Sequence, residues 1–152
     1  MFHPDRVRIL AERRAVCARH GLEALVPLDE RATTAATIYR ANLRLLEGAD
    51  AVVANLTPFR GVHADSGTAW EIGHAVARDV PVFAFSDRPE PLVQRVGNGA
   101  RADGDGMAVE DFGFAENLMI VLGLADRTVH ATFEAAVRAA ARHLSEAREK
   151  RS

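Results

Sequence analysis

The sequence has very little cysteine, since Cys17 is the only one in 152 residues. A single cysteine excludes an internal disulfide framework and any metal site built from several cysteines. Long apolar runs are also missing: none approaches the roughly 18 residues of a membrane span, and no apolar signal core follows the first charged residues. We interpret Cys17 as a packing residue of the first helix, and we expect a cytoplasmic protein without membrane contact.

An excess of charge of one sign is absent as well, because the formal net charge is only -2. Proteins that bind nucleic-acid polymers usually present a broad basic field. We therefore exclude such polymers as partners and expect a ligand that is selected by local chemistry. The hydrophobic share of 48% and the charged share of 26% are ordinary for one globular domain, here residues 1–152.

Helical and strand patterns alternate along the chain. Apolar residues at helical spacing with flanking glycines predict helices, whereas short β-branched runs predict strands. The expected helices are 5–20, 34–47, 68–78 and 128–149, and the expected strands are 22–28, 50–56 and 80–86. Weaker patterns predict a strand over 107–112, a helix or helix start over 117–124, and an exposed loop or lid over 87–106.

This alternation predicts an α/β fold: a doubly wound, flavodoxin-like parallel sheet with helices on both faces. Such a sheet normally opens with a strand before its first helix. Here a helix begins almost at Met1, in MFHPDRVRIL, so the usual first strand is apparently lacking. Two explanations stay open: a truncated start, or a sheet without one central member.

Two carboxylates flank a turn of small residues in GVHADSGTAWEIGHAVARDVPVF, residues 61–83. This turn follows the expected strand 50–56, and ligands of open parallel sheets bind beyond the carboxyl ends of the strands. Asp65 is placed to cap the next helix, and Glu71 lies about one and a half turns further on. Gly67 leaves room for a ligand against the backbone. The residues alone indicate a carboxylate pocket, and a solvated Glu71 remains the common alternative.

The run DAVVANLTPFRGVHADSGTAWEIGHAVA, residues 50–77, resembles the signature of nucleoside 2-deoxyribosyltransferases. In that family a loop of the form NLTPFRG precedes D-x-GT-x-x-E-x-G-x-A, which carries the nucleophile. The resemblance extends from FHPD near the start to VEDFGFAENLM, which ends at residue 119. Family members begin with a strand and a glycine-containing loop that leads into the F-x-P seen here as Phe2, His3 and Pro4. We expect from this that the true start lies upstream of Met1.

The resemblance implies that Glu71 is the nucleophile. Its carboxylate would attack the anomeric carbon of a 2-deoxynucleoside, expel the base and leave a deoxyribosyl ester, which a second base then opens with net retention. The implied partners are small 2-deoxynucleosides and free nucleobases in nucleotide salvage. No metal or organic cofactor is expected. Two alternatives stay open: N-glycoside hydrolysis of a nucleoside or nucleotide, and a nonenzymatic nucleoside-binding module of the same fold.

The resemblance places Asp65 near the sugar, where its negative charge would accept a hydroxyl hydrogen bond and repel a 5-phosphate. Related nucleotide N-hydrolases carry a serine at this position. Asp65 therefore favours unphosphorylated nucleosides as substrates. A pure helix cap is the alternative, and both roles can coexist.

Asn117 matches the family asparagine that reaches the sugar in a neighbouring subunit's site, with Met119 close behind. This implies a homo-oligomer with shared active sites. Capping of the following helix is at least as good an explanation of Asn117.

Further residues are candidates for contacts with the substrate. Asn42 lies where some members carry an aspartate that protonates the leaving base, and because an amide cannot supply that proton, the general acid stays unidentified. Phe59 could stack on a base, and Gly67 and Thr68 would line the sugar site. Asp29 is a further candidate for contact with the base.

The histidines show no metal-ligand spacing supported by a third residue. We expect His63, in the loop that leads to Asp65, to be solvated. His74 is expected to pack or to lie at an interface.

Overall fold

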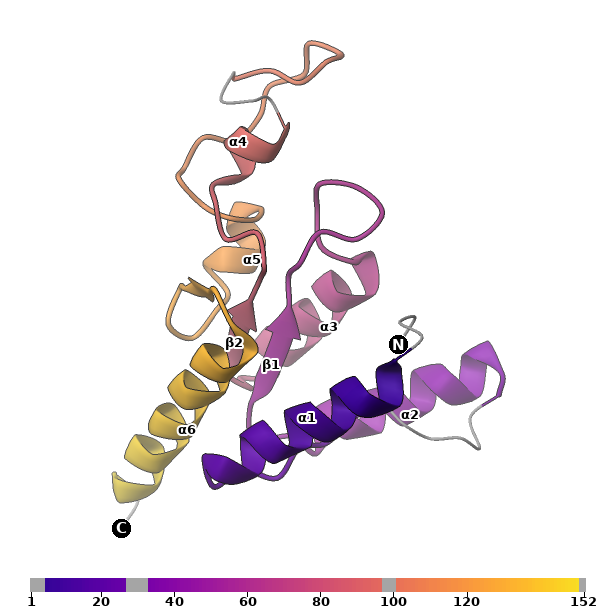
Figure 1. Ribbon diagram of the computed structural model, residues 1–152, viewed down its shortest axis with the longest axis vertical. Coiled ribbons are helices and arrows are strands. Elements are labelled where there is room, and N and C mark those ends of the chain that lie inside the picture. Colours follow the sequence, from indigo (N-terminus) through magenta and orange to yellow (C-terminus); the bar gives the residue numbers. More distant parts are fainter. Residues whose placement is uncertain (1–4, 27–32, 97–100, 151–152) are drawn as a thin grey trace.

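The computed structural model describes residues 5–26, 33–96 and 101–150. Within these ranges a parallel sheet has the order β1-β2-β3, formed by β1 (Val52–Asn55), β2 (Val82–Phe85) and β3 (Val129–His130). The register pairs Val52 with Val82 and Phe85 with His130. Consecutive parallel strands need crossovers, and helices supply them (Figure 1). The predicted α/β fold with a parallel sheet is confirmed.

The helices begin and end where local chemistry favours it. The long helices are α1 (Arg6–Arg19), α2 (Ala35–Glu47), α3 (Ser66–Val76) and α6 (Phe133–Glu149), and the short ones are α4 (Leu92–Val96) and α5 (Leu118–Val121). Thr34 and Thr37 form a reciprocal capping box at α2, and Gly48 ends that helix. The Thr132 side chain accepts a hydrogen bond from the Ala135 amide and starts α6.

The sheet separates two hydrophobic clusters. Side chains alternate between the faces of a strand, so Val82 and Ala84 pack on the side of α3, whereas Phe83 and Phe85 pack on the side of α6. Phe83 is 2% exposed. α1 packs against α6, and α2 packs against α3. This arrangement leaves the loop between β1 and α3 at the carboxyl edge of the sheet (Figure 1).

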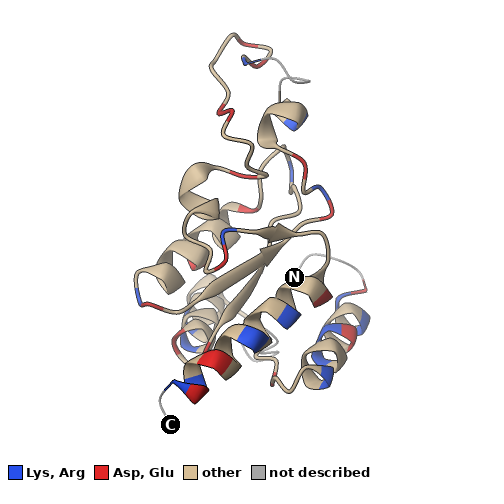
Figure 2. Cartoon of the chain, turned by 90° about the vertical axis from the view of Figure 1, so that its left-hand side faces the viewer, with Lys and Arg blue, Asp and Glu red and all other residues tan. Residues whose placement is uncertain are grey.

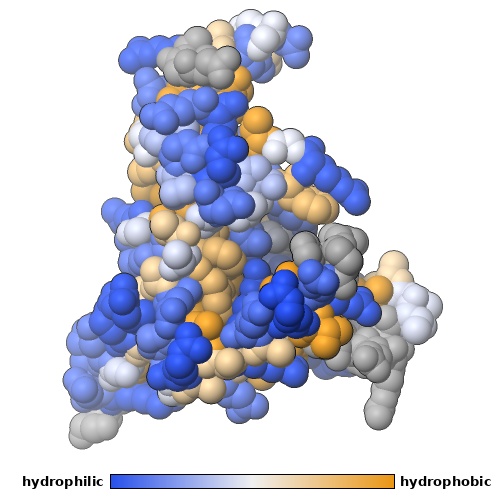
Figure 3. Space-filling view, viewed as in Figure 1, coloured by the Kyte–Doolittle hydropathy of each residue, from blue (hydrophilic) through white to orange (hydrophobic). Residues whose placement is uncertain are grey.

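The outer surfaces of the helices carry charges of both signs. Figure 2 shows basic and acidic residues interspersed on the helices rather than separated by sign. In Figure 3 hydrophilic residues cover much of the face in view, and hydrophobic ones show most clearly near its middle. Of the helices in the described ranges, none has the length and hydropathy to cross a membrane.

Some expected elements are wrong. Residues 22–26 form no strand: Gly21 turns the chain at a φ of +72°, and the Leu22 amide is used to close the end of α1 on the Cys17 carbonyl. The rest of the expected strand 22–28 lies outside the described residues. No strand forms over 107–112, where an isolated antiparallel bridge joins Ala102 to Ala108.

Two further elements differ from the expectation. β3 occupies residues 129–130, which the helix prediction 128–149 had included, because pairing with Ala84 and Phe85 holds this segment extended. α4 lies within the stretch 87–106 that was expected to be an exposed loop, and its Leu92 and Val93 are buried. The Leu92 amide donates to the Phe114 carbonyl, which ties this helix to the body of the domain.

Candidate active site

The carboxylate loop, residues 57–65, joins the end of β1 to the start of α3. Asp65 is the N-cap of α3, and its Oδ2 accepts a hydrogen bond from the Gly67 amide at 3.1 Å. The cap satisfies one of the free amides of the first helical turn. The capping role expected for Asp65 is therefore confirmed.

Glu71 is half-buried on α3, so the alternative of a fully solvated glutamate is wrong. Burial raises the pKa of the Glu71 carboxyl above its ordinary value, and the negative charge of Asp65 raises this pKa further. Both causes disfavour the charged form. The structure therefore brings the two predicted carboxylates close enough to interact.

Gly67 leaves the space that the Asp65 carboxylate occupies. A Cβ atom on Gly67 would lie 2.8 Å from Asp65 Oδ2, which is closer than real contacts of this kind. The glycine thus allows the cap to fold back onto the helix start. Thr68 follows in the first turn and is half-buried.

Phe59 stands at the rim of the carboxylate loop and is half-buried. Its amide donates to the His63 carbonyl at 2.9 Å, which closes the loop on itself. The Arg60 guanidinium lies over the Phe59 ring, 4.9 Å from its centroid. Arg60 adopts a φ of +55°, an uncommon value for a residue with a side chain. One face of the Phe59 ring is therefore in contact with a cation.

Glu116 is a site residue that the sequence analysis missed. Its side chain is 1% exposed, and its Oε1 accepts a hydrogen bond from the Ala64 amide at 2.8 Å. Its Oε2 lies 2.9 Å from Nδ1 of His63 and 3.0 Å from the Asn117 amide. His63 therefore bonds to a buried carboxylate, and the expectation that it is only solvated is wrong. No spacing or period in the sequence marks Glu116.

Asn117 caps α5. Its Oδ1 accepts a hydrogen bond from the Met119 amide at 2.9 Å, and its Nδ2 donates to Glu110 at 2.8 Å. The capping explanation left open above is thus confirmed. Met119, in contrast, is 76% exposed. Within one chain, Asn117 and Met119 belong to α5 rather than to the turn that carries Asp65 and Glu71.

The remaining candidates lie on α2 and α3 or outside the described residues. Asn42 is half-buried on α2, which packs against α3. His74 is half-buried, and its ring stacks on Trp70 at 5.2 Å between centroids, so the packing role expected for it is confirmed. Asp29 and the F-x-P residues 2–4 lie outside the described residues.

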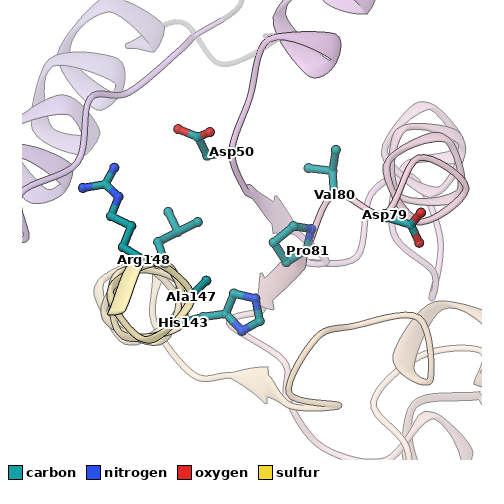
Figure 4. Close-up of a pocket in the computed structure, with 8 residues that line it drawn as sticks. Asp50, Asp79, Val80, Pro81, His143, Ala147 and Arg148 are labelled. Atoms are coloured by element: carbon teal, nitrogen blue, oxygen red, sulfur yellow. The ribbon is translucent and has the colours of Figure 1, made fainter. Parts of the chain in front are cut away.

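A cavity of about 280 Å³ lies at the opposite edge of the sheet. Asp50 and Pro81 line it just before β1 and β2, and His143 of α6 faces them (Figure 4). Because these residues precede the strands, the cavity is separated by the length of the sheet from the carboxylate loop. In the part of the chain that the structure describes, no three His, Cys, Asp or Glu side chains gather as a metal site.

The chain is similar to known proteins in sequence and in fold. The family model described as Nucleoside 2-deoxyribosyltransferase matches residues 1–119, which include the carboxylate loop and Glu71. Among solved structures, the chain is similar to a 2-desoxiribosyltransferase from Leishmania mexicana, with 35% identity and a TM-score of 0.82 over 93% of this chain and 91% of that one. Among curated proteins, it is 25% identical over 148 residues to the uncharacterized protein C191.05c of Schizosaccharomyces pombe, covering 78% of this chain and 70% of the relative.

Proposed function

Because the chain belongs to the nucleoside 2-deoxyribosyltransferase family, we propose that it transfers 2-deoxyribose from a deoxynucleoside to a free nucleobase. The proposal is supported by the family match over residues 1–119 and by the similarity to a relative that carries this activity in its name. The observation that carries it is the half-buried Glu71, whose carboxyl interacts with that of Asp65.

Glu71 is the proposed nucleophile. In its ionised form, a carboxylate oxygen attacks C1 of the deoxyribose, and the bond between C1 and the base nitrogen breaks. The departing base keeps the electron pair of that bond and takes up a proton. A nitrogen of the acceptor base then attacks C1 from the vacated side, loses its proton, and the Glu71 carboxylate leaves. Two inversions give net retention of configuration.

Asp65 has two proposed roles beside its cap. The transition state at C1 resembles an oxocarbenium cation, so a second negative charge nearby stabilises it. The Asp65 carboxylate also accepts a hydrogen bond from a sugar hydroxyl, and its negative charge repels a 5-phosphate. We therefore expect unphosphorylated 2-deoxynucleosides as substrates, with Gly67 and Thr68 beside the sugar.

Two further residues are proposed to contact the base. The Phe59 ring would stack on it at the rim of the loop, and Asn42 would donate or accept a hydrogen bond. Asn42 cannot act as a general acid, because an amide has no acidic proton at neutral pH.

Sharing of active sites between subunits is a further part of the proposal. Met119, at 76% exposed, is available to a second copy of the chain, and we expect Asn117 to come to the neighbouring site with it. Sedimentation measures the assembly. Mixing a Glu71→Ala chain with a Met119→Ala chain then tests for sharing: activity above that of either variant alone supports it, and activity no higher contradicts it.

The transfer itself is tested by incubating deoxyinosine with adenine or cytosine and separating the products by chromatography. A new deoxynucleoside supports the proposal, whereas free deoxyribose alone would indicate hydrolysis. A folded protein that binds nucleoside without turnover would indicate a binding module. Glu71→Ala should abolish the product. Glu47→Ala, at an exposed carboxylate of α2, is the matched control and should retain it.

Mass spectrometry of quenched turnover adds an independent test of the intermediate. We expect a deoxyribosyl adduct on the peptide that contains Glu71, and its loss when excess acceptor base is added. Turnover without any adduct at this peptide would contradict the proposed nucleophile.

A further inference from the structure

Glu116 is a fully buried carboxylate outside the pair proposed to do the chemistry. Its oxygens accept hydrogen bonds from the backbone amides of Ala64 and Asn117, at 2.8 and 3.0 Å. The His63 ring lies 2.9 Å from its Oε2. Arg95, whose side chain is 3% exposed, forms an ion pair with its Oε1 at 3.7 Å. The carboxylate therefore has partners from three separate segments of the chain.

Arg95 connects this carboxylate to the region of α4. Its guanidinium donates to the carbonyls of Arg88 and Glu90 at 2.7 and 3.1 Å, and also to the carbonyl of Ala115. Arg95 lies in the last turn of α4, so its side chain connects the segment 88–96 to the turn before α5. Glu116 and Arg95 together join the carboxylate loop, the α4 region and the turn before α5.

The contact with Ala64 bears directly on the proposed active site. Ala64 immediately precedes Asp65, and Asp65 begins the helix that carries Glu71. The hydrogen bond from the Ala64 amide to Glu116 thus fixes the backbone one residue before the cap. His63, one residue earlier, is held by the same carboxylate.

A buried carboxylate constrains the groups that donate hydrogen bonds to it more than an exposed carboxylate does. Charge-assisted hydrogen bonds are short and strong, and a buried carboxylate that loses a donor bears the desolvation cost without compensation. Residues 63 and 64 therefore cannot move away from Glu116 without losing the hydrogen bonds that stabilise its carboxylate. The carboxylate favours one arrangement of residues 63–65.

We propose that Glu116 is a positioning residue of the transfer reaction, which holds the Asp65 end of α3 so that Glu71 meets C1 at the correct distance. It rests on the proposed function. Glu116 does not contact the substrate; it acts through the Ala64 amide and the His63 ring. Small displacements of reacting groups lower turnover strongly, so the effect falls on kcat more than on KM.

The test compares Glu116→Gln with wild type and with a matched control. Asp126→Asn makes the same chemical change at a carboxylate that also accepts from a histidine ring and a backbone amide, His130 and Thr128, but it does not contact the carboxylate loop. We expect Glu116→Gln to lower kcat at least about 10-fold while KM changes less than about 3-fold. Asp126→Asn should leave both constants at the wild-type values.

Hydrogen exchange gives a second readout that does not need turnover. The Ala64 amide should exchange faster in Glu116→Gln than in wild type, and at the wild-type rate in Asp126→Asn. If Glu116→Gln does not fold, His63→Ala replaces it, because that side chain is 57% exposed and its loss leaves no buried cavity. This variant should lower kcat in the same direction by a smaller factor.

The outcomes separate this inference from the proposed function. A folded wild-type protein without transfer activity removes the proposed function and, with it, the positioning role. An active wild type whose Glu116→Gln variant keeps its kcat overturns the positioning role alone. An equal loss of kcat in Asp126→Asn would also overturn it, because the loss would then follow from general destabilisation.

Discussion

Replacing Asp65 with asparagine separates the cap of α3 from the negative charge beside Glu71. Asparagine caps helices as well as aspartate does, so the hydrogen bond from the Gly67 amide is kept. Only the charge is lost. The pKa of Glu71 is raised first by burial and then by Asp65, so Asp65→Asn removes the smaller cause and lowers this pKa while the effect of burial stays.

Asp65→Ala removes the charge and the cap together. Loss of a capping side chain costs about 1 kcal/mol of unfolding free energy. In a protein of this size, 1 kcal/mol lowers Tm by about 2–4 °C. We therefore expect Asp65→Asn to unfold close to the wild-type temperature and Asp65→Ala to unfold about 2–4 °C lower. Both variants should lower the pKa of Glu71 equally.

The assay follows the carboxyl carbon of Glu71 by NMR through a pH titration, with thermal unfolding as the measure of stability. In the pH profile of kcat/KM, the acid limb should move to lower pH in both variants, because Glu71 as the proposed nucleophile must be ionised to attack. A Glu71 pKa that stays the same or rises in Asp65→Asn would refute the electrostatic reasoning. A Tm of Asp65→Asn as low as that of Asp65→Ala would refute the separation of cap and charge.

Three other substitutions test further parts of the structure. Glu71→Gln removes a carboxyl group whose pKa is higher in the folded protein than in the unfolded chain. As pH rises above about 4.3, the unfolded wild-type chain ionises this group before the folded protein does, so the variant should gain stability over wild type. A difference in Tm between the two proteins that stays the same from about pH 4 to about pH 8 would count against this. Gly67→Ala places a Cβ 2.8 Å from Asp65 Oδ2, so the Asp65 carboxylate must shift and kcat/KM should fall at least about 10-fold. The higher helix propensity of alanine offsets the weakened cap, so the unfolding free energy should stay within about 1 kcal/mol of the wild-type value. A wild-type kcat/KM in this variant would show that the position of Asp65 does not matter. Phe83→Ala should cost about 3–5 kcal/mol in denaturant unfolding, because Phe83 is 2% exposed in the core, and a cost below about 1 kcal/mol would contradict that placement.

The long helices could be predicted from the sequence because their signals are local. α2 has both its capping threonines within the predicted range and its terminal Gly48 directly after it, and α1 ends at the predicted glycine turn. β1 and β2 are apolar, β-branched or aromatic runs, and each lies inside its predicted range. Such signals need no knowledge of the rest of the chain.

The elements that were missed depend on distant partners. β3 has only two residues, so it has no period of its own, and its pairing with β2 keeps it extended. α4 lies among prolines and glycines, and contacts with Phe114 and Ala115 hold it in place. Tertiary pairing overrides local pattern in both cases.

The residues of the candidate site also divide into those with a local signal in the sequence and those that depend on distant partners. Asp65 and Glu71 were found because one short motif carries both, together with the glycine that makes room for the cap. Glu116 was not found because its partners His63 and Ala64 lie 53 and 52 residues away in the sequence. A residue that holds other residues in place shows its role only through such contacts.

The carboxylates of Glu116 and Glu71 differ in how their negative charges are compensated. Glu116 has Arg95 and two backbone amides as partners. For Glu71, within the described part of the chain, burial and the charge of Asp65 both raise the pKa, and neither compensates its negative charge. Under the proposed function, the positive charge that develops on the sugar carbon supplies this compensation, so it favours the transition state over the empty site.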